Sequence, residues 1–168
     1  MVSDNEPHAF ERDLRRQQRD LEDDEIEFDW TTSSLDEALS EIGERGDTVR
    51  LSAAGHSWSG VLAHVGDDLA TIITPAGVEI DVALARLESA RVVERSRGPG
   101  RRMGGHPRML EARLRELVVS GDTVELSVGD GLRGRLVAVA ADHVRVEDGE
   151  GALWLVPTPT IAWVRRQP

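Results

Sequence analysis

The chain lacks several features that would narrow its chemistry. It has no cysteine among its 168 residues, which excludes disulfide bonds and thiolate metal ligands. No apolar run approaches the roughly 20 residues that a membrane-spanning helix needs, and the N-terminus lacks the basic-then-apolar order of a signal peptide. We therefore expect a soluble, cytoplasmic protein without a membrane partner. Lysine is also absent, so all 20 basic residues are arginine.

Negative charge is abundant but unevenly distributed. The formal net charge is −11 at pH 7. Residues 1–49 hold 16 acidic residues and 5 arginines, so the excess lies in the first third of the chain. Residues 95–108, in contrast, hold five arginines and no acidic residue. The sequence thus predicts an acidic N-terminal segment and a basic linker between two nearly neutral modules.

One long sequence pattern occurs twice in the chain. Gly46-Asp47-Thr48-Val49 recurs 75 residues later as Gly121-Asp122-Thr123-Val124. From Gly60 onward the offset is 74 residues, and the matched pairs include Gly60 with Gly134, Leu62 with Leu136, Val65 with Val139, Asp68 with Asp142, Gly77 with Gly151, Val82 with Val156 and Arg91 with Arg165. The two copies differ in length by one residue, in one turn. The pattern predicts an internal duplication.

Each copy predicts one helix followed by five short strands. Apolar residues recur at helical spacing over 35–42 and again over 110–117. Alternating residues over 49–53 and 124–128 predict half-buried strands. Further strands are expected from Gly60 and Gly134, from Asp68 and Asp142, from Gly77 and Gly151, and over 88–94 and 161–166, the last pair after short turns at 83–86 and 157–160. The glycine inside each second strand predicts a sharp bend.

The stretch GDTVELSVGDGLRGRLVAVAADHVRV, residues 121–146, resembles the first motif of Sm-like proteins, in which G-x-x-V-x-V is followed by G-x-L and then by an Asp before the third strand. The resemblance covers both copies. It implies a mainly β fold of tandem, duplicated Sm-like five-stranded small barrels, each preceded by a short helix, with an N-terminal acidic helical segment. The implied parts are an acidic, partly helical segment over 1–32, a first barrel over 33–94, a basic Gly/Arg linker over 95–106 and a second barrel over 107–168.

Two departures from the Sm pattern bear on ligand recognition. The Arg-Gly motif with a nearby Asn in the last loop is absent, and no Asn follows Asp68 or Asp142. Base recognition of the Sm type is therefore not expected at those positions. The stretches VGDDLATI and LWLVPTPTIAWVRR, together with the acidic head and the Arg/Gly linker, are also similar to uncharacterised actinobacterial proteins. Some of these carry a transcriptional-regulator label, but this chain has no helix-turn-helix pattern.

Catalytic and metal-binding patterns are missing from the sequence. The histidines show no metal-ligand spacing with a carboxylate on one helix face; they are His8, His56, His64, His106 and His143. Ser57 and Ser59 adjoin a histidine but have no third member of a catalytic triad. Asp68 and Asp142 are explained by turn formation at a strand start. We therefore predict no enzyme activity, no cofactor and no metal site.

Eight residues are candidates for nucleic-acid binding. Seven arginines could neutralise phosphates and one tryptophan could stack on a base; they are Arg95, Arg97, Arg101, Arg102, Arg108, Arg133, Arg135 and Trp58. The alternatives are a solvated linker for the arginines of 95–108, and packing over the barrel mouth for Trp58. Trp154 and Trp163 lie within predicted strands and are expected in the core or at a barrel interface.

Two functions stay open from the sequence. The first is a non-catalytic nucleic-acid-binding or regulatory module, with RNA favoured over DNA. The second is a protein-interaction or assembly module without a nucleic-acid ligand, in which exposed barrel edge strands pair with each other or with another protein and allow oligomerisation. The acidic segment opposes tight binding of nucleic acid, whereas the Sm-like pattern favours it.

Overall fold

The computed structural model describes residues 33–96 and 104–167. Every helix and strand described below belongs to one compact unit, Leu35–Pro168. The predicted acidic helical segment, 1–32, lies outside the described residues. Across the described ranges, none of the helices is both long enough and apolar enough to cross a membrane.

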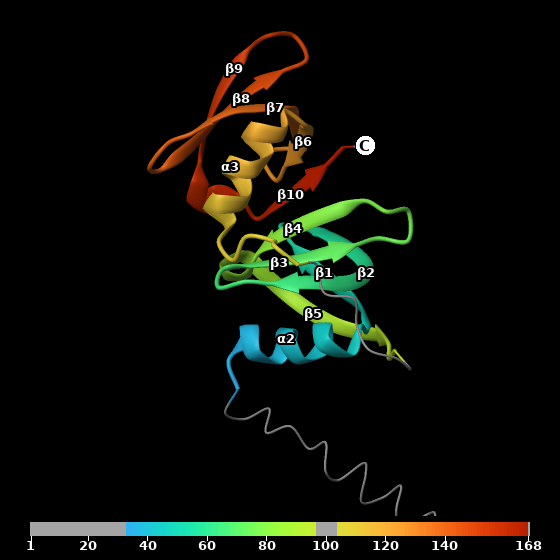
Figure 1. Ribbon diagram of the computed structural model, residues 1–168. Coiled ribbons are helices and arrows are strands. Elements are labelled where there is room, and N and C mark those ends of the chain that lie inside the picture. Colours follow the sequence, from blue (N-terminus) through green and yellow to red (C-terminus); the bar gives the residue numbers. More distant parts are fainter. Residues whose placement is uncertain (1–32, 97–103, 168) are drawn as a thin grey trace, which may run out of the picture. The chain divides into compact units, whose positions relative to one another are not determined.

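The elements of the unit fall into two modules with the same order (Figure 1). Each module has one helix, four strands, a short 3-10 helix and a fifth strand. The first module contains α2 (Leu35–Arg45), β1 (Thr48–Ala53), β2 (His56–Val65), β3 (Leu69–Ile73), β4 (Glu79–Ala83), η1 (Leu84–Arg86) and β5 (Leu87–Glu94). The second contains α3 (Leu110–Ser120), β6 (Thr123–Leu126), β7 (Leu132–Val139), β8 (His143–Asp148), β9 (Leu153–Pro157), η2 (Thr158–Thr160) and β10 (Trp163–Arg166).

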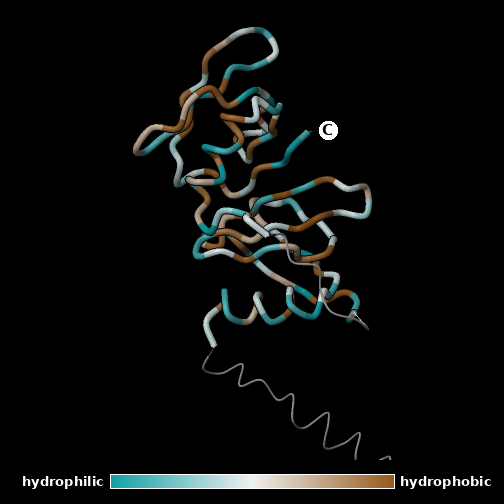
Figure 2. The backbone as a smooth tube through the Cα atoms, in the orientation of Figure 1, coloured by the Kyte–Doolittle hydropathy of each residue, from teal (hydrophilic) through white to brown (hydrophobic). Residues whose placement is uncertain are grey.

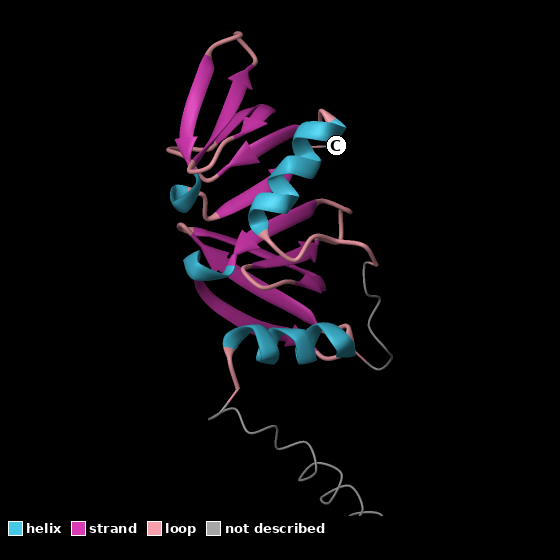
Figure 3. Cartoon of the chain, turned by 60° about the vertical axis from the view of Figure 1, so that its left-hand side comes forward, coloured by secondary structure: helices cyan, strands magenta, loops and turns pink. Residues whose placement is uncertain are grey.

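Local sequence explains where the helices end and the first strands begin. α2 buries Leu39 and Ile42, which lie on the predicted apolar stripe. α3 ends at Gly121, whose φ of 69° is left-handed and whose N–H bonds to the Leu117 carbonyl. α2 packs on β2 and α3 packs on β7, so each helix covers its own module (Figure 3).

The glycine in each second strand permits a close approach of the neighbouring strand. A side chain at Gly60 would collide with the Ile73 carbonyl of β3, and one at Gly134 with the Glu147 carbonyl of β8. A register shift follows in both strands, between Leu62 and His64 and between Leu136 and Ala138. The bend that the sequence predicted at these glycines thus allows the register shift and also leaves room for the neighbouring strand.

The described strands form one open antiparallel sheet rather than two separate closed ones. Its order is β5-β1-β2-β3-β4-β10-β6-β7-β8-β9. Within each module the fifth strand therefore lies beside the first, and β4 of the first module pairs with β10 of the second. The protein is mainly β, as the sequence predicted. Within the described ranges, β5 and β9 form the two edges of the sheet.

Two apolar cores lie along this sheet, and hydrophobic residues recur along the strands of both modules (Figure 2). The buried strand residues include Val49, Leu51, Leu62, Ile72, Val124, Leu126, Leu136 and Val146, and Ile161 just before β10 is buried too. Leu87, at the start of β5, is only partly buried. The cores share members across the modules: Trp163 packs in the first core, and Leu69 packs in the second.

Candidate functional site

The junction between the modules is a short antiparallel strand pair. Its register places Val82 opposite Trp163, Asp81 opposite Val164 and Ile80 opposite Arg165. The Ala83 N–H extends it by donating to the Ala162 carbonyl at 2.9 Å. The pair buries β4 from Ile80 to Ala83. We call this contact the junction.

Trp163 anchors the second module in the first. The residue is 2% exposed, and its ring meets the rings of Trp58 and His56 at centroid distances of 5.1 and 5.0 Å. The expectation that Trp163 lies in the core or an interface is therefore confirmed. Trp154 lies on the edge strand β9 and is 47% exposed, so it is not in the core.

A charge cluster of Glu79, Asp81, His106 and Arg113 lies beside the junction. Arg113, on α3, donates from Nε to Asp81 at 2.8 Å and also pairs with Glu79. The Thr71 hydroxyl donates to Asp81 at 2.6 Å, and His106 Nε2 is 3.5 Å from the same carboxylate. Arg113 and Asp81 are both buried, and this burial lowers the pKa of Arg113. The cluster therefore ties α3 of the second module to β4 of the first.

Three members of the charge cluster could ligate a metal ion. One ligand atom each from Glu79, Asp81 and His106 lie within 4.8 Å of one another, and carboxylate and imidazole suit several divalent metals. In the present arrangement the Arg113 guanidinium occupies both carboxylates, so a cation would first have to displace it. The positions of Glu79, Asp81 and His106 in the sequence did not reveal this grouping. The one sequence feature that pointed to it was the carboxylate of Asp81 inside an apolar strand.

The turn between β2 and β3 holds the start of α3. The Asp68 carboxylate accepts the Leu110 N–H at 2.6 Å, which caps the helix. The Asp67 N–H donates to the Arg108 carbonyl at 2.7 Å, and Gly66 leaves no room for a side chain against that carbonyl. Asp68 therefore does more than form the turn that its position predicted.

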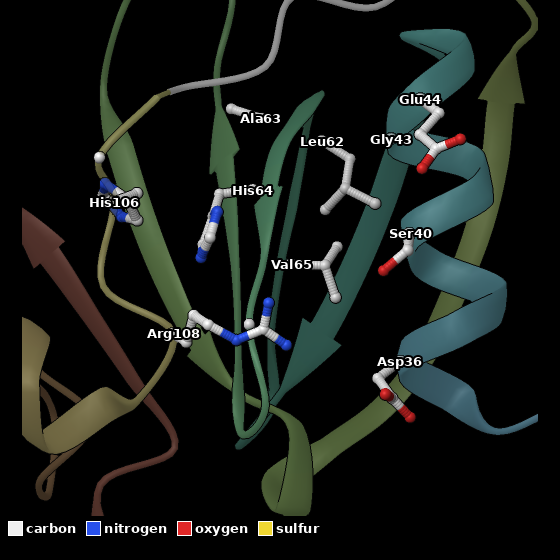
Figure 4. A pocket seen from close by; sticks show the side chains of 12 residues that line it. Asp36, Ser40, Gly43, Glu44, Leu62, Ala63, His64, Val65, His106 and Arg108 are labelled. Atoms are coloured by element: carbon white, nitrogen blue, oxygen red, sulfur yellow. The ribbon is translucent and has the colours of Figure 1, made fainter.

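A polar pocket of about 400 Å³ lies between α2, β2 and residues 105–108 (Figure 4). Asp36 and Glu44 line it on the helix side, and His64, His106 and Arg108 line it on the other. The two imidazole rings lie 4.8 Å apart. Burial lowers the pKa of His64, and the neighbouring His106 lowers it further. Acidic and basic groups thus face one another across the pocket.

Two predicted nucleic-acid-binding arginines lie on the outer face of β7. Arg133 is 3.2 Å from Glu125, and Arg135 is 2.9 Å from Glu147. Each arginine therefore has a carboxylate on a neighbouring strand that partly neutralises it. Both side chains are exposed, so these ion pairs contribute little to stability.

Within the described ranges, the other predicted binding residues lie in separate places. Arg108 donates to Asp67 at 3.0 Å, and Trp58, which lies in β2, packs against Trp163. Arg95 is exposed just after β5 and lines a shallow depression. The remaining three lie outside the described residues; they are Arg97, Arg101 and Arg102.

The free edge of β9 is strongly apolar. Leu153 is 60% exposed and Leu155 is 63% exposed, with Trp154 between them. β9 pairs with β8 on one side, and no other strand in the described part of the chain pairs with its outer side. We call Leu153–Pro157 the β9 edge. The opposite end of the sheet is β5, which pairs with β1 alone among the described strands and exposes Val93.

A comparison with protein-family models and another with curated proteins found no match for this chain. The resemblance to Sm-like proteins therefore stays a prediction from sequence.

Proposed function

We propose that this protein is a non-catalytic assembly module that binds protein partners by strand addition, built from two Sm-like small barrels that arose by internal duplication. The repeated element order and the repeated strand order, fifth-first-second-third-fourth, support this. Leu62 and Leu136 are both buried and both precede a register shift in the second strand of their module. Close backbone approach at the matching glycines adds further support.

The β9 edge is the observation that carries the assembly function. Single exposed apolar residues are ordinary on protein surfaces, but three adjacent large ones on an edge strand are not. An edge strand presents unpaired backbone N–H and C=O groups that can pair with another chain. The β9 edge has no charged residue to prevent this. An extended segment of a partner could thus gain both backbone hydrogen bonds and apolar contact there.

Nucleic-acid binding is the competing function. The basic linker favours it, since Arg95, Arg97, Arg101 and Arg102 lie close together in sequence. The ion pairs of Arg133 and Arg135 and the net charge of −11 weigh against it, because phosphate would compete with carboxylates already in place. We therefore favour a protein partner.

The two functions can be separated by affinity capture. The tagged full-length chain would be incubated with a lysate of its source cells, with and without nuclease, and compared with Leu155→Lys. A matched control is Val119→Lys, because Val119 is 89% exposed but lies on α3. We expect nuclease-resistant protein partners that are lost with Leu155→Lys and kept with Val119→Lys. Loss of every partner on nuclease treatment, or capture indifferent to Leu155→Lys, would overturn the proposal.

A further inference from the structure

We propose that Glu79, Asp81 and His106 form a binding site for a divalent transition-metal ion of the zinc class. The site belongs to the charge cluster beside the junction and does not depend on the β9 edge. Glu79 and Asp81 lie two residues apart on β4, so their side chains leave the sheet on the same face. His106 reaches them from the chain segment that precedes α3. No metal site was expected from the sequence, since the histidines show no ligand spacing on one helix face; these ligands come from a strand and a loop instead.

The three ligand atoms are spaced almost as a metal ion requires. Nitrogen and oxygen ligands lie about 2.0–2.2 Å from Zn²⁺, which places two tetrahedral ligand atoms about 3.3–3.6 Å apart. His106 Nε2 is 3.5 Å from Asp81 Oδ1 and 3.8 Å from Glu79 Oε1, and all three atoms lie within 4.8 Å of one another. Small side-chain movements would therefore supply three corners of a tetrahedron and leave the fourth to water.

The ligand types decide which ion fits. Mg²⁺ and Ca²⁺ prefer sites made of oxygen alone, whereas an imidazole together with carboxylates suits Zn²⁺ and its neighbours in the first transition row. The two carboxylates also balance the charge of a divalent ion. A Zn²⁺ ion is thus the natural ligand of this set, and Mg²⁺ is the natural negative comparison.

Hydrogen bonds outside the site hold two of the ligands in place. The Thr71 hydroxyl donates to the Asp81 carboxylate at 2.6 Å. His64 Nε2 donates to the carbonyl of Pro107, the residue after His106, at 2.9 Å. Metal ligands in proteins are commonly oriented by such outer contacts. The His106 side chain is also only 5% exposed, so its ring has little freedom to turn away.

Arg113 competes with a metal ion for the same carboxylates. Its Nε donates to Asp81 Oδ2 at 2.8 Å, whereas His106 faces the other oxygen, Oδ1. Its guanidinium also pairs with Glu79. A third partner is Glu116, at 3.2 Å on the same helix, whose side chain is 48% exposed. Arg113 can therefore yield Glu79 and Asp81 to a cation and keep a carboxylate nearer the solvent.

The polar pocket between α2, β2 and residues 105–108 gives an ion access to the site. His106 belongs to its wall and lies beside His64 (Figure 4). Asp36 and Glu44 line the helix side of the pocket, and their negative charge favours the entry of a cation. Arg108, the remaining cation in the wall, is paired with Asp67.

The second module shows that the strand does not need these charges. By the 74-residue offset, the counterparts of Glu79 and Asp81 are Leu153 and Leu155, so the fourth strand of a module accepts leucine at both positions. A buried ionic cluster commonly stabilises a protein no better than apolar residues would. The cluster is therefore better explained by what it can bind than by what the fold requires.

Titration of the chelator-treated full-length chain with zinc chloride tests the site directly. Excess magnesium chloride would occupy the acidic surface groups. We expect one saturable Zn²⁺ site, weakened at least about tenfold in His106→Gln and unchanged in His143→Gln, a matched control whose imidazole contacts Asp142 on the surface instead. Arg113→Met should bind Zn²⁺ at least about tenfold more tightly than the natural chain, because a competing positive charge is removed.

Urea unfolding of the same proteins gives a second readout. An ion that binds only the folded state raises the urea midpoint. We therefore expect zinc chloride to raise the midpoint of Arg113→Met, and to have little effect on the double variant with His106→Gln. The proposal would be overturned by a natural chain without a saturable Zn²⁺ site, by affinity that His106→Gln leaves unchanged, or by weaker binding in Arg113→Met.

Discussion

Replacing Arg113 by methionine should destabilise the protein strongly, although the two side chains are similar in length. The change removes the guanidinium that pairs with Asp81 and Glu79. Asp81 would keep the Thr71 hydroxyl as a donor but would remain a carboxylate that is 2% exposed. The substitution thus isolates the cost of a buried charge without its partner.

The expected magnitude follows from the burial of the two carboxylates. Breaking a buried ion pair by removing one partner costs about 3–5 kcal/mol. The Glu79 side chain is 14% exposed and water can hydrate it in part, so we expect about 3 kcal/mol. Replacing the whole set, as Glu79→Leu, Asp81→Leu and Arg113→Met together, should recover most of the loss and come within about 1 kcal/mol of the natural chain. The corresponding carboxylate positions in the second module already carry Leu153 and Leu155.

Equilibrium urea unfolding, followed by tryptophan fluorescence, measures both effects. Trp163 is buried at the junction, so its emission reports separation of the modules. The single and triple variants would be compared at one pH and one salt concentration. A loss below about 1 kcal/mol for Arg113→Met would show that the ion pairs do not hold the junction, since exposed pairs contribute only this much. If the triple variant is no more stable than Arg113→Met, the unpaired buried carboxylates are not the cause of the loss.

Two further outcomes can be measured by the same unfolding assay. Leu136→Ala should cost about 2–5 kcal/mol because it empties a fully buried site, and a cost under about 0.5 kcal/mol would mean the site is not packed. Burial and the neighbouring His106 lower the pKa of His64 below its ordinary 6.5. As the pH falls below 6.5, the unfolded state therefore binds more protons than the folded state. The stability that His64 contributes above pH 6.5 is lost as the pH falls toward the lower pKa of the folded state. His64→Gln should therefore reduce the difference in stability between pH 7.5 and 5.5; an unchanged difference would contradict this.

The elements within each module could be predicted because their signals are local. The alternation of apolar and polar residues over Val49–Ala53 depends only on neighbouring residues, and it predicted the strand β1. The predicted turn over 83–86 is confirmed as η1. The misplacement of Trp154 has a physical reason. An apolar residue in a strand is buried only if the face of the sheet to which it points is covered, and on β9 this holds for Val156 but not for Trp154.

The junction and the charge cluster could not be predicted because they are made by distant residues. Asp81 and Val164 lie opposite each other but are separated by about half of the chain. Arg113 on α3 and Asp81 on β4 are 32 residues apart in sequence and meet only through the tertiary fold. The ion pair of Arg133 with Glu125 also joins neighbouring strands, so the sequence did not show that this arginine has a carboxylate partner.

The junction also orders events while the chain is being made. β4 ends at Ala83 and β10 begins at Trp163, about 80 residues later, so at about 5–20 residues per second β4 waits about 4–16 s for its partner strand. During that interval a growing chain presents an unsatisfied strand whose residues are buried in the finished protein. Neighbouring ribosomes on one messenger RNA would hold such chains close together, and β10 of one could then dock on β4 of another. Domain-swapped dimers are the misassembly that this architecture invites during synthesis.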